Sequence, residues 1–222
     1  MVVATLMPLV VGFVAYGIAW SSGLANFRAP ALIHPELGMH FTLAGSPLVR
    51  FLQCLGIMLV FGALATCKYA AGEEIGWRGY MLTRLIDSKI PAPILISGLV
   101  WGLWHAPLIL SGQYASGPHP ILSAGLFLAD IVAAGYVFAW LRLSSGSIWP
   151  CIWGHSTWNA VIQGAFDRST SGGNLWVGES GALTATALIL FAILLYKAWP
   201  LAQPVSLRAQ KKSVLPDPVV NR

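Results

Sequence analysis

Long stretches of this chain are apolar and almost free of charged side chains. Charged residues make up only 9% of the 222 residues, and hydrophobic residues make up 56%, whereas soluble domains are about one-quarter charged. So few charges cannot cover a surface that faces water, so most of the chain must contact lipid or other helices. Only helix bundles and closed barrels satisfy their backbone groups inside a bilayer. The apolar runs are continuous rather than alternating, which favours the helix bundle.

Six of these runs are long enough to cross a membrane as helices, which takes ~20 mostly apolar residues. The predicted fold is all-α: a single polytopic transmembrane helix bundle over residues 1–203, followed by a polar cytoplasmic tail at 204–222. We expect the proline-containing connection 21–48 to be irregular and the Gly/Ser-rich connection 167–180 to be flexible. The expected spanning helices are, in chain order, 2–20, 49–71, 91–110, 119–141, 147–166 and 181–203.

Lysines and arginines predict how this bundle is oriented. With six spans, Arg28, Arg50 and Arg168 lie on one side, and a larger group lies on the other. Because cytoplasmic loops carry the excess of Lys and Arg, both termini are expected in the cytoplasm. The basic residues flank apolar runs, where they contact anionic lipid headgroups, and their placement does not indicate a nucleic-acid partner. The larger group comprises Arg78, Arg84, Lys89, Arg142, Arg208, Lys211, Lys212 and Arg222.

The densest polar cluster, Glu73-Glu74-Ile-Gly-Trp-Arg78, stands at the end of an apolar helix. If the helix continues, Arg78 lies four residues beyond Glu74 and the two side chains face each other. Adjacent carboxylates repel each other, which makes one of them easier to protonate. Glu73, ~100° around the helix, is then available as a general base. The alternative is a charge cluster at the membrane edge that only anchors the helix.

A histidine, His105, lies deep inside the expected helix 91–110. Gly98, Gly102 and His105 share one helical face, and small residues let a second helix approach closely. His105 is therefore expected to point into the bundle, with Trp101 one turn away and able to pack against its ring. The alternative is a histidine that is merely satisfied within the core.

His155 and Asn159 lie four residues apart in the expected helix 147–166 and share a face. An imidazole and a carboxamide together supply donors for a developing oxyanion. An interhelical hydrogen-bonded pair that only holds the bundle together is the alternative. Asp130, in the middle of the expected helix 119–141, is the remaining acid inside a span, and we expect it to make a structural hydrogen bond.

The depths of these groups in the membrane conflict if every helix is straight. Glu73 would sit at the cytoplasmic edge, whereas His155 lies eight residues into its helix, or ~12 Å at 1.5 Å per residue. We therefore expect the helix that carries Glu73 to continue past residue 74 and tilt, and the segment 75–90 to re-enter the membrane in part. Such a segment is tolerated only beside a cavity.

The three polar elements, taken together, resemble the three motifs of the CPBP family. That family comprises the CAAX prenyl endopeptidases and the bacterial bacteriocin-processing or Abi proteins. The resemblance covers about residues 70–165, and it rests on the order of the motifs and their placement on successive apolar helices. Trp101 stands where the family often has phenylalanine. The matching residues are Glu73-Glu74-xxx-Arg78, Trp101-xxx-His105 and His155-xxx-Asn159.

The resemblance implies an intramembrane endopeptidase of a prokaryotic cell membrane. Glu73 would be the catalytic base and would activate a water together with His105. His155 and Asn159 would stabilise the tetrahedral oxyanion. Glu74, in the same motif as Glu73, would belong to the catalytic set and, together with Arg78, would support the arrangement of the catalytic groups. The expected substrates are membrane-associated or lipidated, CAAX-like proteins or peptides.

A metal site is the main alternative for the chemistry, because family naming often says metalloprotease. Glu73, His105 and His155 would then be the ligands of a zinc ion. The chain lacks the HExxH arrangement that presents two histidines from one helix, and Asn159, a poor zinc ligand, follows His155. We therefore favour catalysis without a metal or other cofactor.

Two other functions compete with proteolysis. A non-catalytic immunity or partner-binding protein would use the same scaffold. A transporter would also need acids inside the membrane, but it would usually show inverted repeats and paired broken helices, which the sequence lacks.

Overall fold

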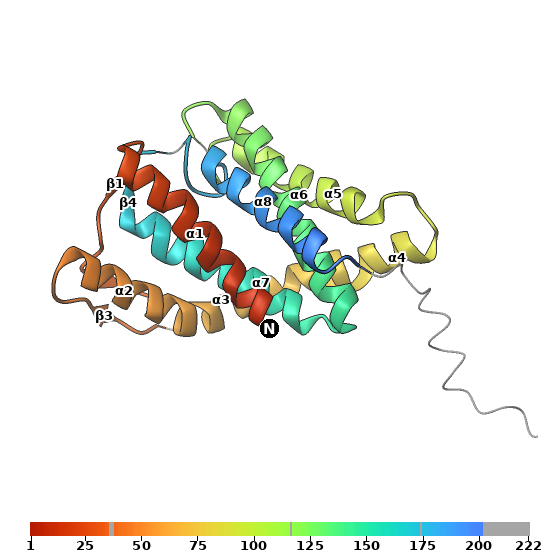
Figure 1. Cartoon of the computed structure of the whole chain (residues 1–222), viewed down its shortest axis with the longest axis horizontal. Coiled ribbons are helices and arrows are strands. Elements are labelled where there is room, and N and C mark those ends of the chain that lie inside the picture. The colour runs from red at the N-terminus through yellow and green to blue at the C-terminus, as the bar shows by residue number, and fades with distance from the viewer. Residues whose placement is uncertain (36–37, 116, 174, 202–222) are drawn as a thin grey trace, which may run out of the picture.

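The computed structural model describes residues 1–35, 38–115, 117–173 and 175–201. It is a bundle of helices with only short strands in the connections (Figure 1). The predicted tail 204–222 lies outside the described residues. The helices are α1 (Val2–Ser22), α2 (Pro47–Ile57), α3 (Ala63–Glu74), α4 (Leu82–Asp87), α5 (Pro93–Leu110), α6 (Pro120–Ser145), α7 (Trp149–Trp158) and α8 (Ala182–Ala198). Three π-helical segments and one 3₁₀ turn continue them: η1 (Met58–Gly62), η2 (Ile75–Met81), η3 (Asn159–Phe166) and η4 (Asp167–Ser169).

Helices occupy all six places where spans were predicted, so the all-α bundle is confirmed. By length and composition, four of the described helices can cross a membrane: Val2–Ser22, Pro47–Asp87, Pro93–Leu110 and Pro120–Ser145. The helix α8 is apolar but shorter. The run α7–η3 is helical over the predicted place but carries the polar side chains of the third motif. The count of six spans is therefore approximate.

A single helix of 41 residues runs from Pro47 to Asp87 and includes α2, η1, α3, η2 and α4. The side chain of Ser46 accepts a hydrogen bond from the N–H of Val49 at its start, a common N-terminal cap. The predicted end at residue 71 is too early, and the expected continuation past residue 74 is confirmed. The segment 75–87 is helical throughout, with the π-helical turn η2 directly after Glu74. Such turns widen a helix locally and are frequent at functional sites.

Two glycines bring α5 and α6 into close contact. A Cβ added to Gly98 would lie 3.2 Å from Cα of Val132, and one added to Gly102 would lie 2.5 Å from Cδ1 of Leu128. The small-residue face predicted for this helix is therefore covered by α6. His105, on the same face, is only 8% exposed, so it points into the bundle as expected.

The helix α7 is held between α1 and α3. Thr157 donates from its hydroxyl to the carbonyl of Ala4 (3.0 Å), and Trp153 donates from its indole to Oγ1 of Thr5 (2.9 Å). On the other side, Oγ1 of Thr66 lies 3.1 Å from the carbonyl oxygen of Ser156. These bonds fix the turn of α7 that carries His155.

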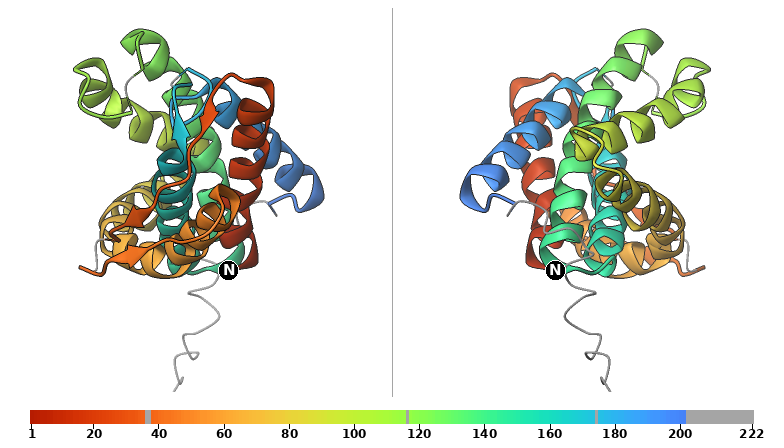
Figure 2. Two further views of the ribbon diagram at one scale, coloured as in Figure 1. Left: turned by 90° about the vertical axis from the view of Figure 1, so that its left-hand side faces the viewer. Right: turned by 90° about the vertical axis from the view of Figure 1, so that its right-hand side faces the viewer.

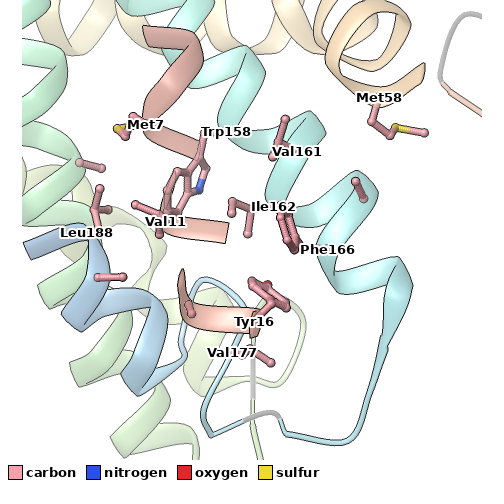
Figure 3. Close-up of a cluster of buried hydrophobic side chains, with 14 of the residues drawn as sticks. Met7, Val11, Tyr16, Met58, Trp158, Val161, Ile162, Phe166, Val177 and Leu188 are labelled. Carbon is pink, nitrogen blue, oxygen red and sulfur yellow. The ribbon is translucent and has the colours of Figure 1, made fainter. Parts of the chain in front are cut away.

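Apolar packing around α1 completes the frame. Side chains from α1, α7–η3 and α8 form one buried cluster (Figure 3), and α8 packs against both α1 and α6 (Figure 2). The cluster includes Met7, Val11, Trp158, Ile162 and Leu188.

Four two-residue strands pair within and between the connections 21–48 and 167–180. β1 (Asn26–Phe27) pairs with β4 (Thr170–Ser171), and β2 (Leu32–Ile33) pairs with β3 (Phe41–Thr42), both antiparallel. The connection 21–48 is thus less irregular than expected.

The described residues of the connection 167–180, which was predicted to be flexible, are hydrogen-bonded and partly buried against the bundle. The N–H of Gly178 donates to the hydroxyl of Tyr16 (3.0 Å), and that hydroxyl donates to Asp167. The side chains of Glu179 and Ser180 are buried. The glycines supply positive φ angles rather than disorder; Gly178, for example, has φ 84°, a conformation that side chains with a Cβ rarely adopt.

Candidate functional site

A small cavity lies where α3, α5, α6 and α7–η3 meet, with a volume of about 40 Å³. That is room for at least one water molecule. Glu73, His105, His155 and Asn159, to which the sequence assigned the base, the water and the oxyanion, all line it, whereas Glu74, assigned to the same catalytic set as a support, does not. The lining residues are Glu73, Trp101, His105, Tyr114, Phe127, Ile131, Ala134, Phe138, His155, Trp158, Asn159 and Glu179.

Glu73 is held at the cavity by two indoles. Trp101 donates its N–H to Oε2 of Glu73 (2.9 Å), and Trp77 donates to the same oxygen at 3.4 Å. Both bonds reach Oε2, so they fix the carboxylate plane without using Oε1. The sequence predicted that Trp101 would pack against His105; its ring does lie 6.1 Å from that imidazole, but its polar group is directed to Glu73.

His105 is fixed through the backbone of the same tryptophan. Its Nδ1 lies 3.0 Å from the carbonyl oxygen of Trp101. A carbonyl only accepts, so Nδ1 carries the hydrogen in the neutral ring and Nε2 is the acceptor. The rings of Trp104, Tyr114 and Phe127 surround the imidazole at centroid distances of 4.7, 5.6 and 4.9 Å. Trp101 therefore links the two groups, with its indole on Glu73 and its carbonyl on His105.

Glu74 does not line the cavity. Its Oε1 accepts from Nη1 of Arg78 (2.8 Å) and lies 2.9 Å from Nδ1 of His155. Glu74 and Arg78 are 0% and 1% exposed, and the four-residue spacing predicts their pairing. The guanidinium also lies over the rings of Trp101 and Phe138, 4.2 and 5.1 Å from their centroids. Glu74 is therefore a buried anion that joins the first motif to the third.

His155 and Asn159 come to the cavity from the two sides of the α7–η3 junction. His155 stacks on Phe138, with centroids 5.6 Å apart and an interplanar angle of 18°. Because its Nδ1 is directed to the Glu74 carboxylate, its Nε2 donates a hydrogen bond only when the ring is the imidazolium. Asn159 is half-buried, and its Oδ1 lies 3.5 Å from Nε2 of Gln163.

Sequence reasoning missed Glu179, which is 7% exposed and lines the same cavity. Its Oε1 accepts from the indole of Trp158 (2.9 Å) and from Nε2 of Gln163 (3.0 Å), and its Oε2 accepts from the hydroxyl of Tyr114. Burial, and then the nearby charge of Glu179, raise the pKa of Tyr114 well above its ordinary value, so this hydroxyl stays protonated and donates. The available signal was a lone carboxylate directly before the last apolar run.

Asp130 does not make the structural hydrogen bond that was expected. Its carboxyl group is 0% exposed, and neither oxygen has a hydrogen-bond partner among the described residues. A buried polar group without a partner is a net cost to stability.

The residues present do not fit a zinc site. Within the described part of the chain, no group of three or more His, Cys, Asp or Glu side chains is arranged to hold a metal ion.

Comparisons with known proteins point to one family. Residues 52–161 match the family of type II CAAX prenyl endopeptidases described as Rce1-like. That range includes all three motifs, whereas Glu179 lies beyond it. The chain is also similar to "CAAX prenyl protease 2" of Methanococcus maripaludis, with 37% identity over 81 residues. That alignment covers 34% of this chain and 30% of the relative. No solved structure matches the chain.

Proposed function

Because the chain belongs to the family of Rce1-like CAAX prenyl endopeptidases, among the CPBP proteins, we propose that it hydrolyses peptide bonds within the membrane. Its substrates would be membrane-associated or lipidated proteins with CAAX-like ends. The observation that carries this proposal is the convergence of Glu73 and His105 on a water-sized cavity, joined through Trp101.

The first step is water activation. A water in the cavity donates one hydrogen bond to the Glu73 carboxylate and the other to Nε2 of His105. As the water oxygen attacks the scissile carbonyl carbon, its proton passes to Glu73 and the carbonyl π electrons move to oxygen. When the C–N bond breaks, protonated Glu73 returns the proton to the leaving amine. A positioned general base of this kind contributes ~10²–10⁴-fold to a rate.

The oxyanion is stabilised from the opposite wall. Asn159 donates an N–H from its carboxamide, and His155 donates from Nε2 as an imidazolium. Glu74 accepts at Nδ1 of that ring and balances its charge. The charges of Glu73, Glu74, Arg78 and His155 then cancel. The remaining carboxylate at the cavity, Glu179, is stabilised by three hydrogen-bond donors, because buried charge without partners is costly. One such donor is worth ~10²–10³-fold in kcat.

A reconstituted assay tests the proposal. The purified chain in liposomes should cleave a fluorogenic peptide that ends in Cys-a-a-X and carries a farnesyl group on the cysteine. Mass spectrometry should show release of the last three residues. The same peptide without the farnesyl group tests the need for the lipid.

Matched variants separate catalysis from binding. Glu73→Gln keeps the shape and the indole hydrogen bonds but removes the base, so cleavage should fall ~10²–10⁴-fold while peptide binding persists. If the parent protein binds the peptide but does not cleave it, the non-catalytic immunity or partner-binding role is favoured. The same holds if Glu73→Gln cleaves the peptide at the parent rate.

We also propose that both termini face the cytoplasm, on the strength of the Lys/Arg distribution. Reporter fusions at residue 115 and after residue 222 should report opposite sides, with the end of the chain cytoplasmic. The same side for both would remove this orientation.

A further inference from the structure

Glu179 is the centre of a hydrogen-bond network that reaches both sides of the cavity. Three donors from three parts of the chain converge on its carboxylate: Tyr114 from the connection after α5, Trp158 from α7 and Gln163 from η3. Neither oxygen of this buried anion lacks a donor, so the group is a fixed acceptor.

The network determines which way the amide of Gln163 faces. A carboxylate only accepts, so Gln163 must direct its –NH₂ to Glu179, at 3.0 Å. The same nitrogen lies 3.3 Å from the hydroxyl oxygen of Tyr114 and 3.5 Å from Oδ1 of Asn159. A carboxamide that turned its own –NH₂ toward Gln163 would meet it donor to donor.

Asn159 is thereby left with one favourable orientation. Its oxygen faces Gln163, and its –NH₂ is directed away from Gln163. Asn159 also lines the cavity, where an N–H donor is what a developing oxyanion requires. The orientation of this amide thus depends on a carboxylate that it does not contact.

The carboxylate of Glu179 also holds the side chain that stacks on His105. Tyr114 donates its hydroxyl to Glu179, and its ring stacks on His105 at a centroid distance of 5.6 Å and an interplanar angle of 29°. The stacked ring restricts rotation of the imidazole whose Nε2 accepts from the water.

We propose that Glu179 is a positioning residue. It sets the Asn159 carboxamide through Gln163 and holds the His105 ring through Tyr114. The inference rests on the proposed peptidase function, and it adds to that function a carboxylate outside the three motifs. Glu179 acts through these two side chains and takes no part in proton transfer.

Gln163→Glu is the sharpest test, because it is isosteric and removes one of the two amide hydrogens. Beside Glu179, which lies 3.0 Å from Nε2 of Gln163 in the parent, the new carboxyl group keeps its proton and donates it to Glu179. It then presents only a lone pair to Asn159, so Asn159 must turn its –NH₂ toward that oxygen and away from the cavity. We expect kcat to fall ~10²–10³-fold, as for loss of one oxyanion donor, with KM within about twofold of the parent. In the Gln163→Glu background, Asn159→Ala should add almost no further loss. Gln163→Glu at the parent kcat would overturn the proposal.

Two changes at Glu179 separate positioning from bulk packing. Glu179→Gln keeps one oxygen for Trp158 and Gln163 and directs its –NH₂ to the hydroxyl oxygen of Tyr114, so kcat should stay within ~10-fold of the parent. Glu179→Leu removes the acceptor, so its kcat should fall to the level of the Gln163→Glu variant. The matched control is Ser180→Ala: Oγ of Ser180 is buried and has no hydrogen-bond partner among the described residues, so its kcat should equal the parent value. Equal losses in Glu179→Gln and Glu179→Leu would contradict an acceptor role.

A measurement independent of activity distinguishes this inference from the proposed function. Thermal unfolding of Gln163→Leu, Glu179→Leu and the double variant forms a mutant cycle. We expect the double variant to lose clearly less than the sum of the two single losses in Tm. Strictly additive losses would overturn the network, whether or not the parent cleaves peptide. If the parent does not cleave the peptide but the cycle still shows coupling, the proposed peptidase function is wrong and the network stands.

Discussion

The indole N–H of Trp101 lies 2.9 Å from Oε2 of Glu73, across the contact between α5 and α3. The side chain of Trp101 thus links the first motif to the second, and its backbone carbonyl accepts a hydrogen bond from His105. A phenylalanine at this position would keep an aromatic ring and lose the hydrogen bond.

Trp101→Phe and Trp101→Ala should therefore differ. The phenylalanine variant retains a ring beneath Arg78 and the bond from Trp77 to Glu73, so we expect kcat to fall ~10–10²-fold, the effect of one hydrogen bond to a charged group. The alanine variant also removes the ring and opens a hole beside the cavity, which should cost ~3–5 kcal/mol of unfolding free energy. Steady-state kinetics and thermal unfolding measure the two effects. Identical behaviour of both variants would show that the indole N–H is the whole contribution of Trp101.

Removing one partner of the ion pair between Glu74 and Arg78 should destabilise the protein more than removing both charges. Arg78→Met leaves the buried Glu74 carboxylate with His155 as its remaining partner and without its permanent countercharge, which should cost ~3–5 kcal/mol, whereas Glu74→Gln combined with Arg78→Met should recover part of that loss. Thermal unfolding in one detergent compares the single and double variants. A double variant that is less stable than Arg78→Met would contradict the pairing.

Replacing Asp130 should stabilise the bundle or leave its stability unchanged. Its carboxyl group is buried without a partner among the described residues, so Asp130→Leu exchanges an unsatisfied polar group for an apolar one of similar size. We expect Tm to rise by a few degrees, since ~1 kcal/mol corresponds to about 2–4 °C at this size. A drop of several degrees would mean that the carboxyl group has a partner after all.

Asp167 should make stability depend on pH. It lies just beyond the predicted span 147–166, and burial raises its pKa from 3.8 to about 7, although the hydrogen bond from Tyr16 acts in the opposite direction. The folded state therefore holds this proton up to higher pH than the unfolded chain does. The stabilisation from proton uptake is full below about pH 4 and is lost as pH rises through about 7. Across pH 5 to 8, thermal unfolding of Asp167→Asn should show a weaker fall in stability than the parent.

Removal of divalent ions should leave the peptidase active. In the proposed mechanism Glu73 and His105 activate the water, and Asn159 and His155 stabilise the oxyanion, so no step requires a Lewis acid. After treatment with a strong chelator, we expect the parent rate and well below one zinc per chain by elemental analysis. Loss of activity on chelation, restored by added zinc, would make Glu73, His105 and His155 the ligands instead.

The sequence predicted the parts of the site that depend on helical spacing. The pair Glu74 and Arg78 follows from four-residue spacing, and the inward direction of His105 follows from the glycines on its face. The contact between Trp101 and Glu73 joins residues from different helices, and no periodicity within one helix encodes it. Glu179 was missed because a Gly/Ser-rich composition predicts flexibility, whereas here the glycines permit the turns that bury its carboxylate.

The helix from Pro47 to Asp87 has 41 residues, which at 1.5 Å per residue is about 60 Å. The hydrocarbon core of a bilayer is only about 30 Å thick. Large apolar side chains are nevertheless exposed along most of this helix, including Leu52, Leu64, Ile75 and Tyr80. A path oblique to the bilayer normal would keep them in contact with acyl chains. The depth of Glu73 below the headgroups would then vary with lipid chain length, so the same protein would hydrate its cavity differently in thin and thick membranes.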